Sequence, residues 1–426
     1  MKTAELKQAL AGTTLDSRFC EIYGSAALEM QKARYLHAVE EFEKLYGADR
    51  EAALYSVAGR SELSGNHTDH NHGCVIAASI DLDIIAVASP SAGSVIRVKS
   101  EGFPEDVVDF DVYNAPNPAR YEKSDSLIAG MVAGFRKEGL AVGGFDAYTT
   151  SNVLKGSGIS SSAAFEDMIG NILNYVYNGG KVSNVEIAKL AQYAENRFFG
   201  KPCGLMDQMA CAVGGIIAID FRDPSAPVIE QTDFDLSAAG YNLCIVNTGG
   251  NHADLTGDYA SVPAEMKSVA AYFGKEVLRD TDENAVLAAI PALREKVGDR
   301  AILRALHFFA ENRRVAAQKA ALKAGDLDTF LANVIASGRS SFCYLQNVYT
   351  TKNVSEQGLS LALCLAERVL SGKRAAWRVH GGGFAGTIQA FVPTEDVAEF
   401  RAVMDAAFGE GRCMVLRVRP EGALRV

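Results

Sequence analysis

The chain has 426 residues, of which 48% are hydrophobic and 22% are charged. This composition excludes disorder over most of the chain, because disordered segments combine low hydrophobicity with high charge. At ~150 residues per domain, the length predicts two or three domains. The 42 Lys and Arg residues against 52 Asp and Glu residues give a net charge of −10, so no global basic surface exists for nucleic acid.

The cysteines and the N-terminal segment favour a cytoplasmic protein. No two of the eight cysteines have the C-x-x-C spacing, and residues 1–19 lack the ~7–15-residue apolar core of a secretory signal. Free thiols in the cytosol are therefore expected. The longest apolar stretches, such as residues 84–88, are far shorter than the ~20 residues of a membrane span, so no membrane partner is expected.

The first predicted elements are a helix and two strands on either side of a polar loop. Large apolar side chains recur at helical spacing at Tyr35, Val39, Phe42 and Tyr46. This spacing predicts a helix over residues 28–46, ended by Gly47. Residues 54–60 and 74–88 are apolar and β-branched runs bounded by Gly, Ser and Pro, a pattern that predicts strands. The polar stretch between them is therefore a loop.

A strand, a glycine-serine loop and a helix are predicted next, followed by a second helix and a second strand. They cover residues 145–153, 155–162, 163–177, 185–199 and 215–221, in that order. We place a domain boundary after this second strand, which divides the chain into residues 1–235 and 236–426.

The second domain is predicted to contain a long helix that ends at Gly325. One face of this helix carries Ile302, Leu306, Phe309, Ala316 and Ala320. Residues 359–370 form a second helical pattern, and residues 387–393 form a strand. The mixture of helices and strands in both halves predicts two α+β domains.

The glycine-serine loop is the first candidate site. Its glycines let the backbone approach a ligand, its hydroxyls can donate to phosphate oxygens, and the helix after it offers unpaired amides. These are the parts of a phosphate-binding loop, although the Walker pattern G-x-x-x-x-G-K-[ST] does not occur. The alternative is a serine-rich cap on a flexible turn. The candidate residues are Gly156, Ser157, Gly158, Ser160, Ser161, Ser162 and Ala163.

Three histidines make residues 67–72 the second candidate, with Arg60 shortly before them. The spacing H-x-x-H-x-H matches no common zinc site. A dense set of donors and acceptors for the hydroxyls of a polar small molecule is the better interpretation. A solvated polar loop is the alternative, although apolar strands would hold this loop on both sides.

Two further segments carry candidate chemistry. Asp207 stands among apolar and small residues in segment 202–208, and a buried carboxylate there must meet a cation or hold a proton, unless it caps a helix. Residues 381–386 match G-x-G-x-x-G, but a strand rather than a helix follows them. Dinucleotide binding is therefore rejected, and a tight turn close to the active site remains.

Together these segments resemble the galactokinase branch of the GHMP small-molecule kinases. The matching segments are residues 58–73, 155–166, 202–208, 252–259 and 378–387. The resemblance spans most of the chain. It implies an N-terminal domain of the ribosomal-S5-like α+β type, a ferredoxin-like C-terminal domain, and an active site between them that uses ATP and Mg²⁺.

The resemblance also implies roles for particular residues. Asp207 and Arg60 would be the catalytic pair, residues 160–163 would wrap the phosphates of ATP, and Ser162 and Glu195 would lie nearest Mg²⁺. Sugar contacts are implied at Asn66, His67, Asp69, Gly204 and Tyr259.

The chain departs from the family pattern in the segment that would bind sugar. The family has Asn, Ile, an acidic residue and Tyr where this chain has Glu62, Ser64, Asn66 and His70. In relatives the acid at position 66 accepts a hydrogen bond from a sugar hydroxyl, whereas an amide can also donate. Residues 260–266 lack a basic cluster and residues 337–353 differ as well. We therefore expect a divergent subgroup.

The expected reaction transfers the γ-phosphoryl group of Mg-ATP to the anomeric O1 of galactose. Because Arg60 should lower the pKa of Asp207, the aspartate would be a weak base that orients the hydroxyl and takes its proton late. The alternatives are another sugar, such as an N-acetylhexosamine or a pentose, and a catalytically silent sensor of sugar and ATP. No sequence feature identifies a protein partner.

Overall fold

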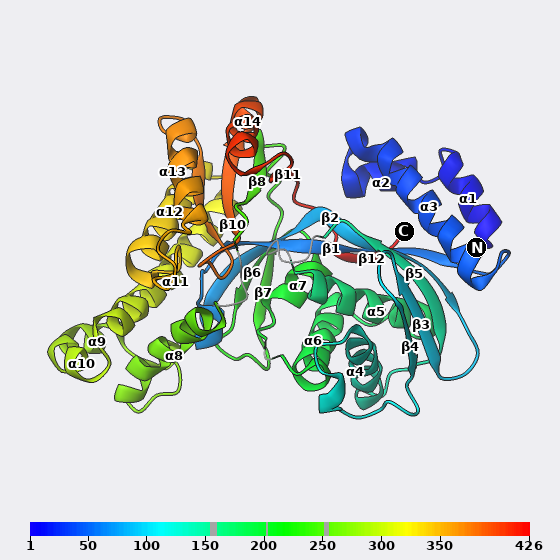
Figure 1. Cartoon of the computed structure of the whole chain (residues 1–426), viewed down its shortest axis with the longest axis horizontal. Helices are drawn as coiled ribbons and strands as arrows, with labels where there is room; N and C mark the ends of the chain where they lie inside the picture. The colour runs from blue at the N-terminus through cyan, green and yellow to red at the C-terminus, as the bar shows by residue number, and fades with distance from the viewer. Residues whose placement is uncertain (154–159, 202, 251–254) are drawn as a thin grey trace.

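The computed structural model describes residues 1–153, 160–201, 203–250 and 255–426. These residues form two sheets that lie side by side, each with its own covering of helices (Figure 1). The predicted two-domain α+β architecture is confirmed. All eight cysteines lie in the described part and are free thiols, as expected.

The first sheet is built mainly by the N-terminal half of the chain. Its strand order is β12-β1-β2-β5-β3-β4, and β6 and β7 extend it from β2. The strands are β1 (Ala53–Ser64), β2 (Cys74–Pro90), β3 (Val95–Ser100), β4 (Glu105–Asp109), β5 (Phe145–Ser151), β6 (Ile216–Asp220), β7 (Val228–Thr232) and β12 (Ala423–Arg425). Strand β2 pairs with β5 through residues 84–90 and with β6 through residues 74–78. The predicted strands around the polar loop are therefore β1 and β2.

Helices cover both faces of this sheet, which explains why β1 and β2 are apolar on both sides. One face carries α4 (Ser124–Lys137), α5 (Ser161–Tyr177), α6 (Asn184–Ala194) and α7 (Met206–Val213). The other face carries α1 (Thr3–Ala11), α2 (Asp16–Tyr23) and α3 (Leu28–Tyr46), which form a separate core with the sheet. In Figure 1 the two groups lie above and below the long strands. Helix α3 has the predicted bounds, whereas α1 and α2 are too short for a clear apolar stripe.

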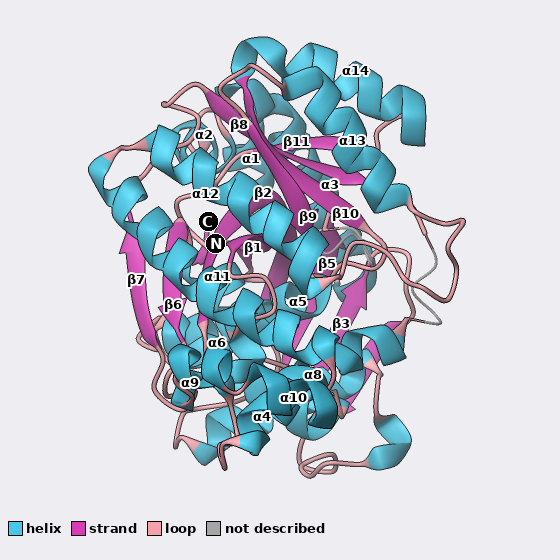
Figure 2. Ribbon diagram, turned by 90° about the vertical axis from the view of Figure 1, so that its left-hand side faces the viewer, coloured by secondary structure: helices cyan, strands magenta, loops and turns pink. Residues whose placement is uncertain are grey.

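The second sheet has strand order β11-β8-β10-β9, all antiparallel. Its strands are β8 (Tyr241–Asn247), β9 (Ala376–His380), β10 (Thr387–Pro393) and β11 (Cys413–Leu416). Helices α13 (Gly358–Leu370) and α14 (Val397–Phe408) pack on it through an apolar core. Figure 2 shows these helices beside the long strands of this sheet. The helix predicted over residues 359–370 and the strand predicted over residues 387–393 are confirmed.

A group of helices joins the two sheets. It contains α8 (Thr256–Tyr272), α9 (Glu283–Ala288), α10 (Ile290–Lys296), α11 (Asp299–Ala324) and α12 (Leu327–Ser340). Helix α11 ends where predicted, because Gly325 takes a left-handed conformation with φ of 68°. Its buried face carries polar groups, His307, Glu311 and Gln318, as well as apolar ones.

The end of the chain returns to the first sheet. Strand β12 pairs antiparallel with β1, from Ala423 opposite Val57 to Arg425 opposite Tyr55. No sequence pattern indicates this return, because a strand of three residues is too short to show a period. The change from one sheet to the other along the chain falls between β7 and β8, and the boundary at residue 235 stays a prediction.

A buried ionic cluster ties the N-terminal helices to this returning segment. Asp83 of β2 accepts from Arg34 at 2.5 Å and from Arg419 at 3.2 Å. Tyr23 and Ser56 donate to the same carboxylate.

None of the helices in the described part of the chain combines the length and apolar character that a bilayer span needs.

Candidate active site

The centre of the candidate site is an ion pair between a strand and a helix of the first domain. Arg60 lies in β1, opposite Ser79 of β2, and Asp207 lies in the first turn of α7. The guanidinium makes two hydrogen bonds to the carboxylate, Nε to Oδ1 at 2.8 Å and Nη2 to Oδ2 at 2.9 Å. This bidentate geometry fixes the plane of the carboxylate as well as its position.

The aspartate is held as an anion. Burial would raise the pKa of Asp207, but the charge and hydrogen bonds of Arg60, the Ser160 hydroxyl and the charge of Lys201 leave that pKa lowered. The alternative that Asp207 caps a helix is wrong, because Leu205 is the cap residue. About a third of the Asp207 side chain is exposed, 34%, against 9% for Arg60, so a ligand can reach the carboxylate.

The part of the glycine-serine loop that the structure describes lies against this pair. Ser160 takes a left-handed conformation with φ of 57° just before α5, and its hydroxyl donates to Asp207 Oδ2. Because that hydroxyl turns to Asp207, the alternative of a serine side-chain cap does not hold for Ser160. Ser161 and Ser162 are half-buried in the first turn of α5, and Ala163 is buried. Gly156, Ser157 and Gly158 lie outside the described residues.

Glu195 lies beside Ser162, as the predicted metal pair requires. It starts a π-helical turn, Glu195–Phe199, and its Oε1 accepts from Ser162 at 3.4 Å and from Lys201 at 3.2 Å. Gln208 donates from Nε2 to Glu195 at 2.7 Å and to Glu166 at 3.2 Å. Burial and the nearby Glu195 charge raise the pKa of Glu166 well above its usual value. Sequence reasoning missed Lys201, Gln208 and Glu166 because nothing in their spacing marks them.

We call residues 65–73, which join β1 to β2, the histidine loop. Asp69 of this loop faces Gly204, and a Cβ at position 204 would lie 2.8 Å from Asp69 Oδ2. A side chain at position 204 would therefore displace the Asp69 carboxylate. Burial first, and then the charge of Glu62, raise the pKa of Asp69 to about 6.

The histidines form a directed chain of hydrogen bonds. His67 Nε2 lies 2.8 Å from the Gly382 carbonyl oxygen, which can only accept, so this nitrogen carries the proton. Burial lowers the pKa of His67 and of His70, so both rings are neutral at pH 7. His67 Nδ1 then accepts from His70 Nε2 at 3.4 Å, and His70 Nδ1 accepts from Asn71 at 3.0 Å. Within the described ranges, no group of three or more His, Cys, Asp or Glu side chains could hold a metal ion.

The residues 381–386, which we call the glycine turn, connect β9 to β10 as the tight turn that the sequence predicted. A Cβ at Gly383 would lie 1.9 Å from the Asn347 carbonyl oxygen, and a Cβ at Gly382 would lie 2.4 Å from the Tyr259 ring. Tyr259 donates to the Gly383 carbonyl at 2.7 Å. The turn is thus pressed between the histidine loop and α8.

Asn66 lies in the histidine loop with no exposed side-chain surface. Glu62, which also departs from the family pattern, forms a buried ion pair with Arg378 of β9 at 2.6 Å. Sequence reasoning missed Arg378, together with Ser341 and Asn347, both of which bond to Asn66. Charge, size and spacing do not mark these residues, because they meet the loop from distant parts of the chain.

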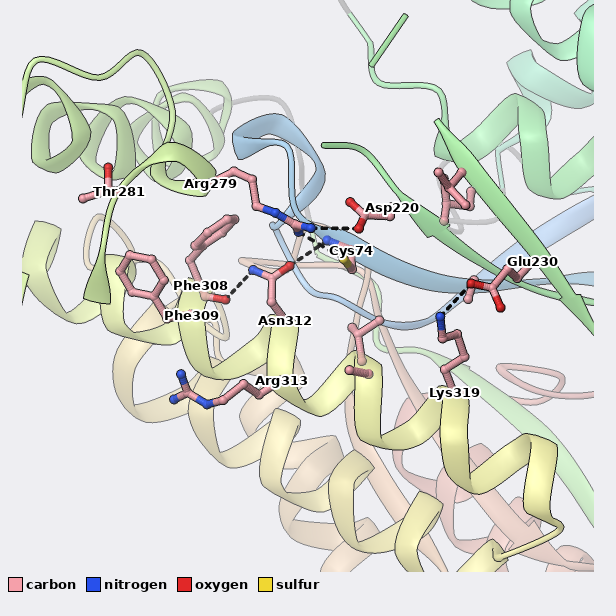
Figure 3. A pocket seen from close by; sticks show the side chains of 15 residues that line it. Cys74, Asp220, Glu230, Arg279, Thr281, Phe308, Phe309, Asn312, Arg313 and Lys319 are labelled. Atoms are coloured by element: carbon pink, nitrogen blue, oxygen red, sulfur yellow. Dashed lines mark hydrogen bonds and ion pairs between the residues drawn. The ribbon is translucent and has the colours of Figure 1, made fainter. Parts of the chain in front are cut away.

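The cavity in Figure 3 is a different place from this site. It has a volume of about 440 Å³ and lies between β6, β7 and α11. Its walls include Cys74, Asp220 and Arg279, and Arg279 binds Asp220 at 2.8 Å. None of the predicted site residues in the described part lines it.

Comparison with known proteins identifies the family. The model for the galactokinase galactose-binding signature matches residues 40–90, and the model for the GHMP kinases N terminal domain matches residues 126–215. Galactokinase of Streptomyces coelicolor is 32% identical over 378 residues, which cover 87% of this chain and 92% of that protein. The chain belongs to the galactokinase family. Galactokinase of Glaesserella parasuis is 30% identical over 372 residues, covering 85% of this chain and 91% of that protein.

Solved structures of galactokinase and related kinases share the fold. Lactococcus lactis galactokinase complexed with galactose superimposes with a TM-score of 0.75 at 24% identity, covering 91% of this chain and 98% of that one. Mevalonate kinase of Methanococcus jannaschii gives a TM-score of 0.61 at 15% identity, covering 86% of this chain and 98% of that one. The predicted GHMP kinase fold is confirmed.

Proposed function

We propose that this chain is an ATP-dependent sugar kinase that transfers the γ-phosphoryl group of Mg-ATP to the O1 hydroxyl of galactose, giving galactose 1-phosphate and ADP. The observation that carries the proposal is the bidentate Arg60–Asp207 pair, whose carboxylate is partly exposed beside Ser160. The relatives named galactokinase support the same reaction. We place the reaction in the cytosol, where eight free cysteines stay reduced.

Asp207 orients the sugar hydroxyl and takes its proton. Its lowered pKa keeps it a carboxylate at neutral pH, so it can accept a hydrogen bond from O1–H. A loose transition state breaks most of the bond between the γ-phosphorus and ADP before the bond to O1 is complete. The O1 proton therefore becomes acidic late, passes to Asp207, and then leaves to water, which a weak base can accomplish.

Arg60 stabilises negative charge on the Asp207 carboxylate and on the phosphoryl group that is transferred. Its side chain is almost fully buried, and a guanidinium keeps its charge at any accessible pH. Its bidentate contact fixes the carboxylate in the plane needed to meet the hydroxyl, and its charge lowers the energy of the negative phosphoryl group as it moves.

Residues at the start of α5 would hold the nucleotide and its metal. The amides and hydroxyls of residues 160–163 are placed at a helix N-terminus, which favours phosphate. Ser162 and Glu195 lie 3.4 Å apart and offer the hard oxygen donors that Mg²⁺ prefers, and Mg²⁺ in kinases commonly uses one or two protein groups plus substrate phosphates. Bound there, Mg²⁺ would neutralise phosphate charge.

The sugar would lie between the histidine loop and segment 203–207. Asp69 offers a carboxylate beside Gly204, whose lack of a side chain leaves room. His67 and Tyr259 bond to carbonyls of the glycine turn, and we propose that both side chains also contact the sugar.

The test is ADP release with Mg-ATP and a panel of free sugars, beside an Asp207→Asn control that excludes a contaminating kinase. Turnover on galactose that the control lacks supports the proposal. Turnover on an N-acetylhexosamine or a pentose instead would show that this other sugar is the substrate and would make residues 61–72 the basis of selectivity. Binding of ATP and galactose by calorimetry without turnover would make the chain a sensor.

A further inference from the structure

Asn66 uses every hydrogen-bonding position of its side chain inside the protein. Its Nδ2 donates to Glu62 Oε1 at 3.1 Å and to the Gly381 carbonyl at 2.6 Å. Its Oδ1 accepts from Ser341 Oγ at 3.1 Å and from Asn347 Nδ2 at 2.8 Å. A primary amide has two donor and two acceptor positions, so a contact between Asn66 and a sugar hydroxyl would require one of these bonds to break.

Asn66 and three other side chains form hydrogen bonds to three consecutive carbonyls of the glycine turn. Asn66 donates to the carbonyl of Gly381. His67 and Asn347 approach the carbonyl of Gly382 at 2.8 Å and 3.2 Å. Tyr259 donates to the carbonyl of Gly383. The position of the turn therefore sets the position of His67 and Tyr259.

The bonding pattern requires an amide at position 66 rather than an acid. A carboxylate could still accept from Ser341 and Asn347, but its second oxygen would face the Gly381 carbonyl and the Glu62 carboxylate, which are both acceptors. The family pattern places Asn at position 62 and an acid at position 66, so this chain carries the two groups exchanged. Here the acid at 62 is neutralised by Arg378 at 2.6 Å.

Residues 337–353, which also depart from the family pattern, provide bonding partners for the unusual Asn66. Ser341 and Asn347 both belong to residues 337–353, and both are fully buried against Asn66. The amide of Phe384 also donates to the Asn347 carbonyl at 2.5 Å. The unusual segment thus bonds to the unusual loop residue and to the glycine turn together.

We propose that Asn66 is a positioning residue, not a sugar ligand: its amide locks the glycine turn to the histidine loop and to residues 341–347, and so orients His67 and Tyr259 toward the sugar. The inference rests on the proposed function for its effect on sugar. Its structural half, the locking of the turn, holds or fails independently of any activity.

The first experiment compares full-length wild-type protein with Asn66→Asp. This change keeps the size of the side chain and both of its acceptor positions, but it replaces the donor that faces Gly381 and Glu62. We expect the KM for galactose to rise about 10-fold with kcat changed less than about 3-fold, because ground-state and transition-state binding of the sugar weaken equally. The KM for ATP should stay unchanged.

A matched control separates this effect from a general loss of stability. Asn312→Asp makes the same chemical change at a half-buried residue whose Nδ2 donates to a carbonyl, that of Phe308 at 2.8 Å. Asn312 accepts from the amide of Cys74, the first residue of β2, directly after the histidine loop, and no hydrogen bond links its side chain to the described residues of the glycine turn. We expect normal sugar kinetics from this control, and an equal rise in its sugar KM would overturn the proposal.

Two rescue variants keep the proposal falsifiable if the buried charge unfolds Asn66→Asp. Glu62→Gln in the Asn66→Asp background provides a new donor to Asp at position 66 and should recover part of the sugar affinity. Ser341→Ala removes one donor without adding charge and should raise the sugar KM about 3-fold in the same direction. Failure of both variants to move the sugar KM as stated would overturn the proposal.

Amide hydrogen exchange tests the structural half without any turnover. Asn66→Asp and Ser341→Ala should speed exchange at Phe384, whose amide bonds to Asn347, while Asn312→Asp should not. Unchanged exchange at Phe384 in both variants would overturn the locking role. If wild-type protein phosphorylates no sugar while these exchange rates rise, the proposed function fails and the positioning role stands.

Discussion

Two aspartate–arginine clusters, around Asp83 and around Asp207, have the same chemistry and opposite access to solvent. Asp83 and Arg419 have no exposed side-chain surface, and the Asp83 carboxylate is further enclosed by Arg34, Tyr23 and Ser56. Asp207, by contrast, has 34% of its side chain exposed beside Arg60. Burial acts to raise the pKa of both carboxyls, but the arginine charges and the hydrogen bonds together outweigh it and leave each pKa lowered.

Solvent access to the carboxylate, rather than its pairing with arginine, distinguishes the structural cluster around Asp83 from the candidate catalytic cluster around Asp207. The protein donors around Asp83 leave its side chain no exposed surface, so no substrate can reach this carboxylate and the cluster can only join elements. It links α3, β2 and the returning C-terminal segment through residues 34, 83 and 419. The exposed side of the Asp207 carboxylate can accept a hydrogen bond from a substrate hydroxyl. The same exposure lets water reach the ion pair with Arg60.

The largest effect should follow from breaking the enclosed cluster. Asp83→Asn leaves Arg34 and Arg419 facing a neutral group in a buried site, so we expect the free energy of unfolding to fall by about 3 kcal/mol. Urea denaturation measures this change. The kcat of the folded variant should stay within about twofold of wild type, because Asp83 does not contact the candidate site.

The same cluster predicts acid sensitivity with a definite sign. A folded pKa below the unfolded value of about 3.9 stabilises the fold above that pH, and the stabilisation is lost as pH falls through the folded pKa. Asp83→Asn should therefore flatten the acid limb of stability. Equal acid sensitivity in wild type and variant would contradict the account of Asp83.

The second prediction removes the charge from the open cluster. Asp207→Asn should lower kcat by at least about 100-fold, because the side chain loses the base that accepts the O1 proton. The free energy of unfolding should fall less than in Asp83→Asn, since the exposed side of position 207 lets water solvate the neighbourhood. Near-normal turnover in a folded variant would remove Asp207 from the mechanism.

The third prediction tests the bidentate geometry of the open cluster. Arg60→Lys keeps the positive charge but provides a single point of contact instead of two parallel bonds. We expect kcat to fall about 10-fold, by analogy with the loss of one charge-assisted hydrogen bond worth ~1.4 kcal/mol. Steady-state kinetics at saturating sugar and ATP measure it, and an unchanged kcat would mean that charge alone suffices.

The sequence predicted the open cluster and not the enclosed one, for a physical reason. Asp207 stands out as a lone carboxylate among apolar and small residues, and the resemblance to galactokinases implies its pairing with Arg60. Asp83 lies inside an apolar strand, and its partner Arg419 lies in a tail that returns to the first sheet. No local period shows such a long-range pairing.

The same limit applies to the candidate site. The segments around residues 60, 160, 207 and 382 could be found from the sequence because each has its own motif. The contacts of Asn66 with Ser341 and Asn347 could not, because these residues lie far along the chain and meet Asn66 only when the segment after α12 packs against the histidine loop. The bounds of α3 and α13 followed periodicity, whereas β1 continues to Ser64 inside the stretch predicted as a loop, α6 ends at Ala194 rather than at residue 199, and the short elements α1, α2 and β12 were not predicted.

The smallest expected effect concerns Asp69, whose pKa is shifted in the opposite direction from those of Asp83 and Asp207. Burial first, and then the charge of Glu62, raise the pKa of Asp69 to about 6, although backbone amides oppose the rise. As pH falls below about 6, Asp69 takes up a proton and no longer accepts from a sugar hydroxyl as a carboxylate does. We therefore expect the sugar KM to rise several-fold from about pH 7 to pH 5 at saturating ATP. Asp69→Asn should have a raised KM that no longer changes over this range, and a wild-type KM that is flat with pH would show that the charge of Asp69 does not bind the sugar.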